Sequence, residues 1–291
     1  RRLNYKPNIM ASNLRTSKNT TIGVVIPELN HHFFSSILDG IEQVANEAGY
    51  NILICQTGEN VEKEVRSIQT LIGSRVAGIL VGVSKQTERL YHLQEVLDQN
   101  IPLVLYDRPC PSLKCDQVVS DDYMGAYNAV EYLIQTGKRK IMYLSSSIQL
   151  EVSRRRYQGW RDALLRYHIP ITDDMIMECD TRSKAIIAAP SILQRENRPD
   201  GIFCVNDDCA AGVLHVAKIL GLKLPDDLSI CGFSDAPLCR ATQPMLTTVQ
   251  QHGVEIGRRA TARLLERLNG DDRIVKTEMV PADLIVRETT K

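Results

Sequence analysis

The sequence lacks the short motifs that most often mark a catalytic or nucleotide-binding site. It contains no G-x-x-x-x-G-K-[ST] phosphate-binding loop, no G-x-G-x-x-G after its first predicted strand, and no G-x-S-x-G nucleophile elbow. These absences argue against a P-loop NTPase, a dinucleotide-dependent enzyme and an α/β-hydrolase. We therefore expect no cofactor and propose no catalytic residue.

A long apolar run and a net charge are also missing. No stretch approaches the roughly 20 apolar residues of a membrane-spanning helix, and the printed chain shows no signal peptide. Lysine plus arginine number 35, as do aspartate plus glutamate, so the body of the chain is not expected to bind a polyanion. We expect no membrane contact.

Metal-binding and disulfide patterns are absent as well. None of the eight cysteines forms a C-x-x-C pair, and no Cys/His cluster has zinc spacing. Several cysteines lie in apolar runs such as NILICQ and GIFCVN, where they are expected to be small buried residues in a reducing compartment. His31 and His32 are adjacent in a predicted loop, where neighbouring side chains rarely converge on one metal ion.

What the sequence does have is an alternation of apolar runs with amphipathic helical patterns. The predicted strands are 21–27, 50–56, 77–83, 102–108, 117–121, 140–146, 175–179, 201–206, 228–233, 247–250 and 275–286. The predicted helices are 34–49, 61–74, 87–99, 125–136, 154–167, 185–194, 208–220 and 254–268.

Strands that are apolar on both faces and joined by helices indicate an α/β fold with parallel sheets covered by helices. About ten such strands are too many for one compact sheet in a chain of 291 residues. The pattern therefore predicts two doubly wound lobes, with ligands bound at the carboxyl ends of the strands in a cleft between the lobes.

Two pairs of adjacent carboxylates open predicted helices. Asp121 precedes Asp122, and Asp207 precedes Asp208. Such pairs can serve in catalysis, but an acidic residue at a helix start also caps backbone N–H groups and meets the positive end of the helix dipole. We expect capping to be at least part of their role.

The amino-terminal stretch is locally basic. Five basic residues precede the first acidic residue, Glu28, and they are Arg1, Arg2, Lys6, Arg15 and Lys18. Such a strip suits contact with phosphate groups or an acidic surface, and it equally suits a solvated terminus.

Taken in order, these features resemble the lactose-repressor (LacI/GalR) family of bacterial transcription regulators, over essentially the whole chain. The segments that carry the resemblance are YKPN (5–8), ASNL (11–14), IGVVIP (22–27), NHHFF (30–34), VVSDD (118–122), GKRKI (137–141), RYQGW (156–160), GIFCVNDD (201–208), GLKLPDDLSICGF (221–233) and PMLTTVQQ (244–251). The resemblance implies lobes like those of type I periplasmic binding proteins. On that basis we expect a hinge segment at 1–19, an amino-terminal lobe at 20–145 plus 252–273, and a carboxyl-terminal lobe at 146–251 plus 274–291.

The resemblance also gives a role to the basic terminus. In this family the segment forms a hinge helix that folds on operator DNA, and a leucine, here Leu14, wedges into the minor groove. The residues that this implies as DNA-binding are Lys6, Asn8, Ala11, Leu14, Arg15 and Lys18. The helix-turn-helix that the family carries ahead of the hinge lies outside the printed sequence. Ser12 stands where the family often has arginine, so one basic contact is missing.

Effector-binding residues are carried over by position in the same way. They are His32, Phe33, Phe34, Asp121, Arg156, Phe203, Asn206, Asp207, Ser234, Asp235 and Gln251. Phenylalanine rings could stack on a sugar ring or a base, and we expect one of Phe33 and Phe34 to pack into the core instead. Asn206 and Asp207 offer donors and acceptors that suit a polyol, and Arg156 suits ligand hydroxyls or a carboxylate.

One departure from the family pattern bears on the effector. Many sugar-responsive members have Gly-Phe-Asp-Asp where this chain has Gly-Phe-Ser-Asp, so Ser234 replaces a ligand-binding aspartate and Asp235 follows it. With one carboxylate fewer, we hypothesise an acidic effector such as a sugar acid, held by Arg156.

The resemblance therefore implies a ligand-responsive, DNA-binding transcriptional regulator that acts as a repressor, with a small sugar or sugar acid as its effector. It is expected to be a cytoplasmic homodimer, because the extra carboxyl-terminal segment used by tetrameric members is not seen before Lys291. An exported, monomeric sugar-binding protein of a transport system is the alternative with the same lobes. An enzyme is disfavoured because no acid/base pair has telling spacing.

Overall fold

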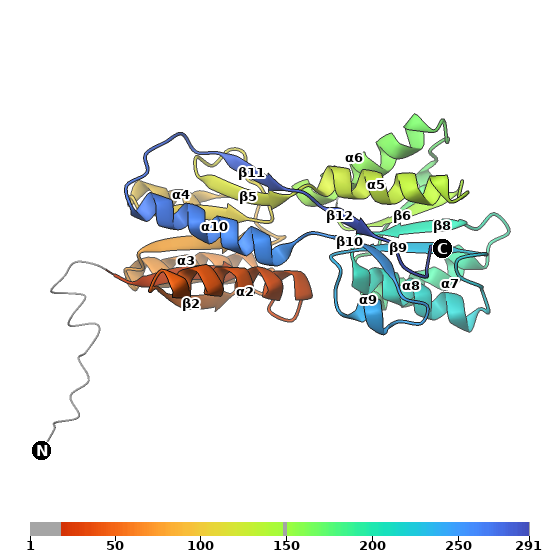
Figure 1. Ribbon diagram of the computed structural model, residues 1–291, viewed down its shortest axis with the longest axis horizontal. Helices are drawn as coiled ribbons and strands as arrows, with labels where there is room; N and C mark the ends of the chain where they lie inside the picture. Colours follow the sequence, from red (N-terminus) through yellow and green to blue (C-terminus); the bar gives the residue numbers. More distant parts are fainter. Residues whose placement is uncertain (1–18, 148–149, 291) are drawn as a thin grey trace, which may run out of the picture. The chain divides into compact units, whose positions relative to one another are not determined.

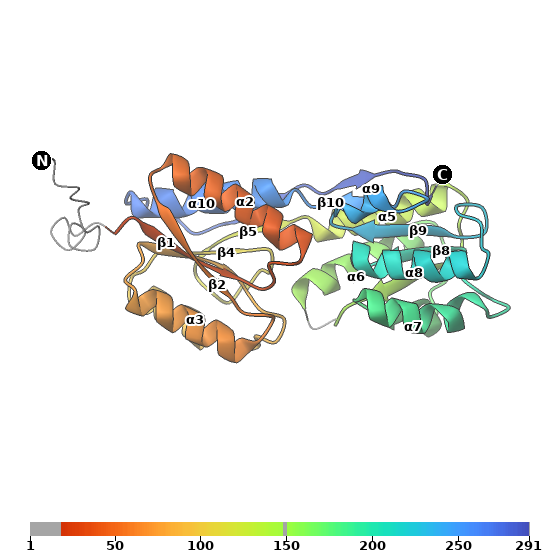
Figure 2. The same ribbon diagram turned by 90° about the horizontal axis from the view of Figure 1, so that it is seen from below.

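In the computed structural model, which describes residues 19–147 and 150–290, the chain forms two compact units. The first unit runs to Val118 and resumes over Gly253–Glu278; the second comprises Val119–His252 and resumes at Met279. Figures 1 and 2 show that each unit is a sheet with helices on both faces. The predicted fold class is confirmed.

The first unit is built around a six-stranded sheet of order β11-β5-β4-β3-β1-β2. Its strands are β1 (Thr21–Ile26), β2 (Asn51–Gln56), β3 (Gly78–Gly82), β4 (Leu103–Tyr106), β5 (Asp116–Ser120) and β11 (Thr277–Val280). Its helices are α2 (His32–Glu47), α3 (Val61–Gly73), α4 (Tyr91–Asp98) and α10 (Gly253–Leu268). β1 pairs in parallel with β2 and β3, as expected for strands joined by helices.

Helices α2 and α10 lie side by side in the first unit, although they are far apart in the sequence (Figures 1 and 2). Glycines allow this close approach. A Cβ atom at Gly40 would lie 2.0 Å from the backbone oxygen of Val254, and one at Gly257 would lie 2.0 Å from that of Ile37. The two helices can therefore touch backbone to backbone only because both positions lack a side chain.

The second unit repeats this plan with a sheet of order β12-β10-β9-β8-β6-β7. Its strands are β6 (Ile141–Ser145), β7 (Ile176–Glu178), β8 (Gly201–Cys204), β9 (Ser229–Phe233), β10 (Thr247–Gln250) and β12 (Asp283–Ile285), the last antiparallel to β10. Its helices are α5 (Asp122–Gln135), α6 (Glu151–Arg166), η1 (Asp173–Met175), α7 (Arg182–Leu193), α8 (Asp207–Ile219) and α9 (Leu238–Ala241). Helices α5 and α6 pack together around the fully buried Trp160, and α7 and α8 pack together over a separate cluster.

The predicted lobe boundaries differ from the observed ones. We expected the first lobe to extend to residue 145, but α5 packs on α6 and β6 pairs with β8, so the change of unit falls at Val118. The run 275–286 was expected as one strand. It is interrupted at Pro281, which has no N–H to donate to a neighbouring strand, and its two parts join different sheets as β11 and β12.

Candidate functional site

Five of the predicted site residues gather at one edge of the second unit's sheet. Asn206 and Asp207 follow β8, Ser234 and Asp235 follow β9, and Gln251 follows β10. Because β8, β9 and β10 run parallel, their carboxyl ends meet at this edge, where α/β proteins usually bind ligands. The hydroxyl of Ser234 donates to Oε1 of Gln251 at 2.9 Å, which links two of the loops directly.

Asp207 organises the loops at this edge. Its side chain is buried and accepts hydrogen bonds from the hydroxyl of Thr248 and, at 2.8 Å, from the N–H of Ala236. Burial raises the pKa of Asp207 to about 6. A Cβ atom at position 232 would lie 2.3 Å from the carboxylate, so Gly232 leaves room for it.

Asn206, rather than Asp207, caps helix α8. Its Oδ1 accepts from the N–H of Cys209 at 2.8 Å, and its Nδ2 donates to the carbonyl of Asp180 at 2.7 Å. The amide therefore ties the start of α8 to the segment that follows β7. Both ends of the Asn206 side chain are engaged in holding the loop.

Asp235 is neutralised by two arginines. Its carboxylate accepts from Arg287 at 2.5 Å and from Arg240 at 3.1 Å, and its side chain is almost wholly buried. Ser234 and Asp235 both have positive φ, 118° and 52°, so the turn that presents them is sharply bent.

Arg156, predicted to bind the effector, is paired with the buried Asp122. One guanidinium nitrogen lies 2.7 Å from Oδ1 of Asp122, another donates to the carbonyl of Val205 at 2.6 Å, and the group stacks 3.8 Å from the ring centroid of Phe233. Burial raises the pKa of Asp122 in spite of this cation. Asp121 caps α5 instead, accepting from the N–H of Met124 at 3.0 Å, which confirms the expected capping role.

Phe203 lies in the core of the second unit. It is fully buried, with its ring centroid 5.3 Å from that of Tyr143 and 6.2 Å from that of Phe233. The family resemblance implied a ligand contact for Phe203, but the ring packs in the buried cluster that includes Tyr143, Trp160 and Phe233. In the described structure it is a packing residue.

The predicted aromatic residues of the first unit lie at the start of α2. His32 is exposed, whereas Phe33 and Phe34 are both buried, so more of this segment packs inward than the sequence indicated. Phe34 lies beneath Arg108, whose guanidinium carbon is 5.5 Å from the ring centroid.

A polar cluster in the first unit was missed by the sequence analysis. Arg108, just after β4, pairs with Glu59 through two contacts of 2.7 and 2.8 Å and donates to the carbonyl of Val83 at 2.5 Å. Nearby loops are joined by a 2.7 Å hydrogen bond between the hydroxyls of Thr57 and Ser84. Thr57, Glu59 and Ser84 follow predicted strands and Arg108 ends one, so a search of the strand ends would have placed these residues at one edge of the sheet, although it would not have shown which side chains pair.

The remaining predicted features lie elsewhere. The DNA-binding candidates Lys6, Asn8, Ala11, Leu14, Arg15 and Lys18 lie outside the described residues. Over residues 19–147 and 150–290, no group of His, Cys, Asp and Glu could hold a metal ion. Within the same ranges, no helix has the length and apolar character needed to span a membrane.

Comparison with known proteins adds three findings. Residues 130–290 match the model of a family described as periplasmic binding protein-like domain. The chain is 34% identical to the HTH-type transcriptional repressor PurR of Vibrio vulnificus (strain CMCP6), over 99% of this chain and 86% of that protein. It is 31% identical to catabolite control protein A of Priestia megaterium, over 100% of this chain and 87% of that protein.

A solved structure agrees with these relatives. The periplasmic binding protein/LacI transcriptional regulator from Alkaliphilus metalliredigens QYMF, in complex with D-xylulofuranose, superposes with a TM-score of 0.82 at 27% identity. The match covers 94% of this chain and 100% of that one.

Proposed function

The chain belongs to the LacI family of transcriptional regulators, and from that premise we propose that it is a DNA-binding repressor controlled by a neutral sugar. The relatives are a transcriptional repressor and a catabolite control protein, and one similar structure holds a sugar. The observation that carries the proposal is the set of polar residues gathered at the carboxyl edge of the second sheet, around Ser234 and Gln251.

The charges at this edge favour a neutral effector over the sugar acid suggested by the Gly-Phe-Ser-Asp departure. Arg156 is already paired with Asp122, and Asp235 with Arg240 and Arg287. An acidic ligand would have to break the buried Arg156 pair, leaving Asp122 without its cation. The hydroxyl groups of a neutral sugar can bind without breaking either of these ion pairs.

Gln251 supports a ligand with oxygen acceptors. Its side chain is 1% exposed, and within the described residues its Nε2 has no hydrogen-bond partner. A buried amide donor without an acceptor costs roughly 1–3 kcal/mol, which a hydroxyl or ring oxygen of a sugar would recover. Ser234, bonded to the same amide, offers a hydroxyl that can accept as well as donate.

The sugar acts by binding one conformation of the repressor better than another. Its differential affinity then shifts the population that binds the operator, and the operator shifts sugar affinity by the same factor. We propose that DNA is contacted through the hinge residues Lys6, Asn8, Ala11, Leu14, Arg15 and Lys18, by two copies of the chain acting as a homodimer. The protein would work in the cytoplasm, without a cofactor and without catalysing a reaction.

The test is calorimetric titration of the protein with matched sugars, comparing neutral pentoses and hexoses with their aldonic and uronic acids. We expect at least one neutral sugar to bind, and Gln251→Ala to weaken it by about tenfold, the equivalent of one hydrogen bond of roughly 1.4 kcal/mol. Arg154→Ala, on the exposed side of α6, is the control and should leave affinity unchanged. Binding confined to the acids would refute a neutral effector.

A second measurement addresses the regulator itself. Random duplexes are selected for binding to a chain that carries the family's helix-turn-helix ahead of the hinge, and the selected duplex is titrated with and without the sugar found by calorimetry. A change in duplex affinity supports sugar control, and recovery of no preferred sequence would count against a repressor.

A further inference from the structure

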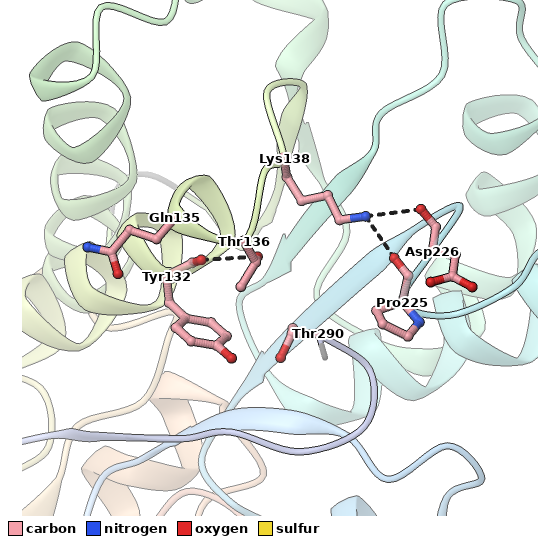
Figure 3. A pocket seen from close by; sticks show the side chains of 7 residues that line it. All are labelled: Tyr132, Gln135, Thr136, Lys138, Pro225, Asp226 and Thr290. Atoms are coloured by element: carbon pink, nitrogen blue, oxygen red, sulfur yellow. Dashed lines mark hydrogen bonds between the residues drawn. The ribbon is translucent and has the colours of Figure 1, made fainter.

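The basic run Lys138-Arg139-Lys140, at the start of β6, has no part in the proposed function. Its first residue, Lys138, is held by hydrogen bonds within the second unit. Figure 3 shows Lys138 reaching toward the turn at Pro225 and Asp226, and its ammonium donates to those two carbonyls at 2.7 and 3.2 Å. The pocket that Lys138 borders therefore has its cation already engaged by backbone.

Arg139 and Lys140 line a different cavity, of about 290 Å³, in the same unit. The loop before β8 contributes Arg195 to it. The cavity lies where β6, β7 and β8 begin, which is the opposite edge of the sheet from the carboxyl ends that bear Asn206 and Ser234. It is therefore separate from the predicted sugar site.

Positive charge exceeds negative charge along this cavity. Its lining has three cations, Arg139, Lys140 and Arg195, and one carboxylate, Asp174. Arg139 donates to two backbone carbonyls, at 2.7 and 2.8 Å, and Lys140 donates to the neutral amide oxygen of Asn197. Neither contact supplies a counter-charge.

Arg195 is only loosely held. Its Nη1 lies 3.5 Å from Asp174, its Nη2 lies 3.8 Å from the sulfur of Met142, and its Nε has no acceptor in the part of the chain that the structure describes. Asp200, which precedes β8, accepts hydrogen bonds at its carboxylate from the backbone N–H groups of Arg139 and Lys140, and not from their side chains. An arriving anion could thus engage Arg195 without displacing a tight ion pair.

The wall behind these cations is apolar. Met142, Ile169 and Pro199 line the cavity and are buried. A volume of 290 Å³ is near the lower end of small-molecule sites, which run from roughly 300 to 1,000 Å³. We propose that this cavity binds a small organic anion, a phosphate monoester or carboxylate on an apolar body of about one ring. The anionic group meets Arg195 and Lys140, and the ring meets Met142 and Ile169.

The test is calorimetric titration with phenyl phosphate and benzoate, each at up to about 1 mM. Phenol keeps the ring without the charge, and inorganic phosphate keeps the charge without the ring. We expect at least one organic anion to bind, both comparators to bind at least tenfold more weakly, and affinity to fall as salt is raised. The ratio of the phenyl phosphate and benzoate affinities identifies the preferred anionic group.

Variants assign the binding to the cavity. Arg195→Ala and Lys140→Ala should each weaken it by roughly tenfold to a hundredfold, the effect of losing a charged hydrogen bond. Asp174→Asn should tighten it by about two- to fivefold, because it removes the one like charge from the lining. Arg198→Ala, in the same loop but outside the lining, is the matched control.

The outcomes are separable from those of the proposed function. Sugar affinity should be the same in Arg195→Ala as in the unmodified protein, and a fluorescence unfolding curve checks that each variant is folded. Absence of binding by both organic anions, equal binding of phenol, or an equal loss in Arg198→Ala would each overturn the assignment. So would weaker binding by folded Asp174→Asn.

Discussion

The buried pair of Arg156 and Asp122 allows a sharp prediction. The exposed fractions of the two side chains are only 9% and 2%, so values for buried pairs apply instead of the 0–1 kcal/mol of surface pairs. Asp122→Ala leaves the guanidinium buried without its counter-ion and should cost roughly 3–5 kcal/mol. For a unit of this size that corresponds to a fall in Tm of about 6–20 °C.

The raised pKa of Asp122 adds a second expectation. It means that burial disfavours the carboxylate by more than Arg156 favours it. Replacing both partners by apolar residues, as in Asp122→Leu with Arg156→Met, should therefore bring stability back to within about 1 kcal/mol of the original. Stability is lost when one partner goes and largely regained when both go.

Tryptophan fluorescence makes this measurable in the second unit alone. Trp160 is the chain's single tryptophan, is fully buried, and lies on α6 with Arg156. Urea unfolding followed at this residue gives the free energies of the two single variants and the double variant. Arg154→Ala, which breaks an exposed pair on the same helix, should cost less than about 1 kcal/mol.

The reasoning would be refuted if Asp122→Ala cost less than about 1 kcal/mol, or if the losses of the single variants simply added in the double variant. A third result would also refute it. If Arg156→Ala kept full stability but lost the effector, the arginine would be a ligand group, as the family resemblance implied, and not a member of a structural pair.

Three further predictions concern other residues. Burial raises the pKa of Asp207 from 3.8 to about 6, so its contribution to stability falls as the pH rises between these values. The urea midpoint of the unmodified protein, followed by fluorescence, should therefore decrease over this pH range, and the decrease should be smaller in Asp207→Asn. Gly40→Ala should lower the free energy of unfolding by roughly 1–3 kcal/mol, because the added methyl group forces α2 away from α10. In the control Gly73→Ala the methyl group meets nothing within 4 Å, so stability should not fall; unfolding followed by circular dichroism measures both. Glu59→Gln should cost about 1–3 kcal/mol at neutral pH. Burial raises the pKa of Glu59, but its contacts with Arg108 outweigh this effect and hold the pKa below its usual value. The difference in stability between Glu59→Gln and the unmodified protein should therefore vanish in acid, where Glu59 is protonated. Hydrogen exchange of backbone amides in the first unit measures this difference.

Sequence reasoning located the strands and the edge that bears the polar residues, because apolar runs and the helices between them are local patterns. The run IGVVIP is buried as β1, and the loops after β8, β9 and β10 meet as parallel strands require. Sequence reasoning could not identify which residues pair when they lie far apart in the chain. Arg108 and Glu59 are 49 residues apart, and nothing in either neighbourhood indicates the other.

Orientation was the second thing that local patterns could not give. Asp121 and Asp122 are adjacent, yet a helix turns by about 100° per residue, so one caps α5 while the other faces Arg156. Phe203 shows the same difficulty in a strand, where alternate residues face opposite sides of the sheet: Phe203 packs in the cluster with Trp160, and its neighbours Ile202 and Cys204 pack in the other cluster. Motif matching fixes a residue's position but not its direction.

The order in which segments enter the two units has a consequence for synthesis of the protein. The first unit includes Gly253–Glu278, so its sheet and its α2–α10 contact cannot be completed until residue 278 has left the ribosome. The nascent chain must therefore carry an unfinished first unit while the whole of Val119–His252 is being translated. Premature termination before Gly253 would leave α2 without its partner helix α10, and such fragments are natural substrates for chaperones and proteases.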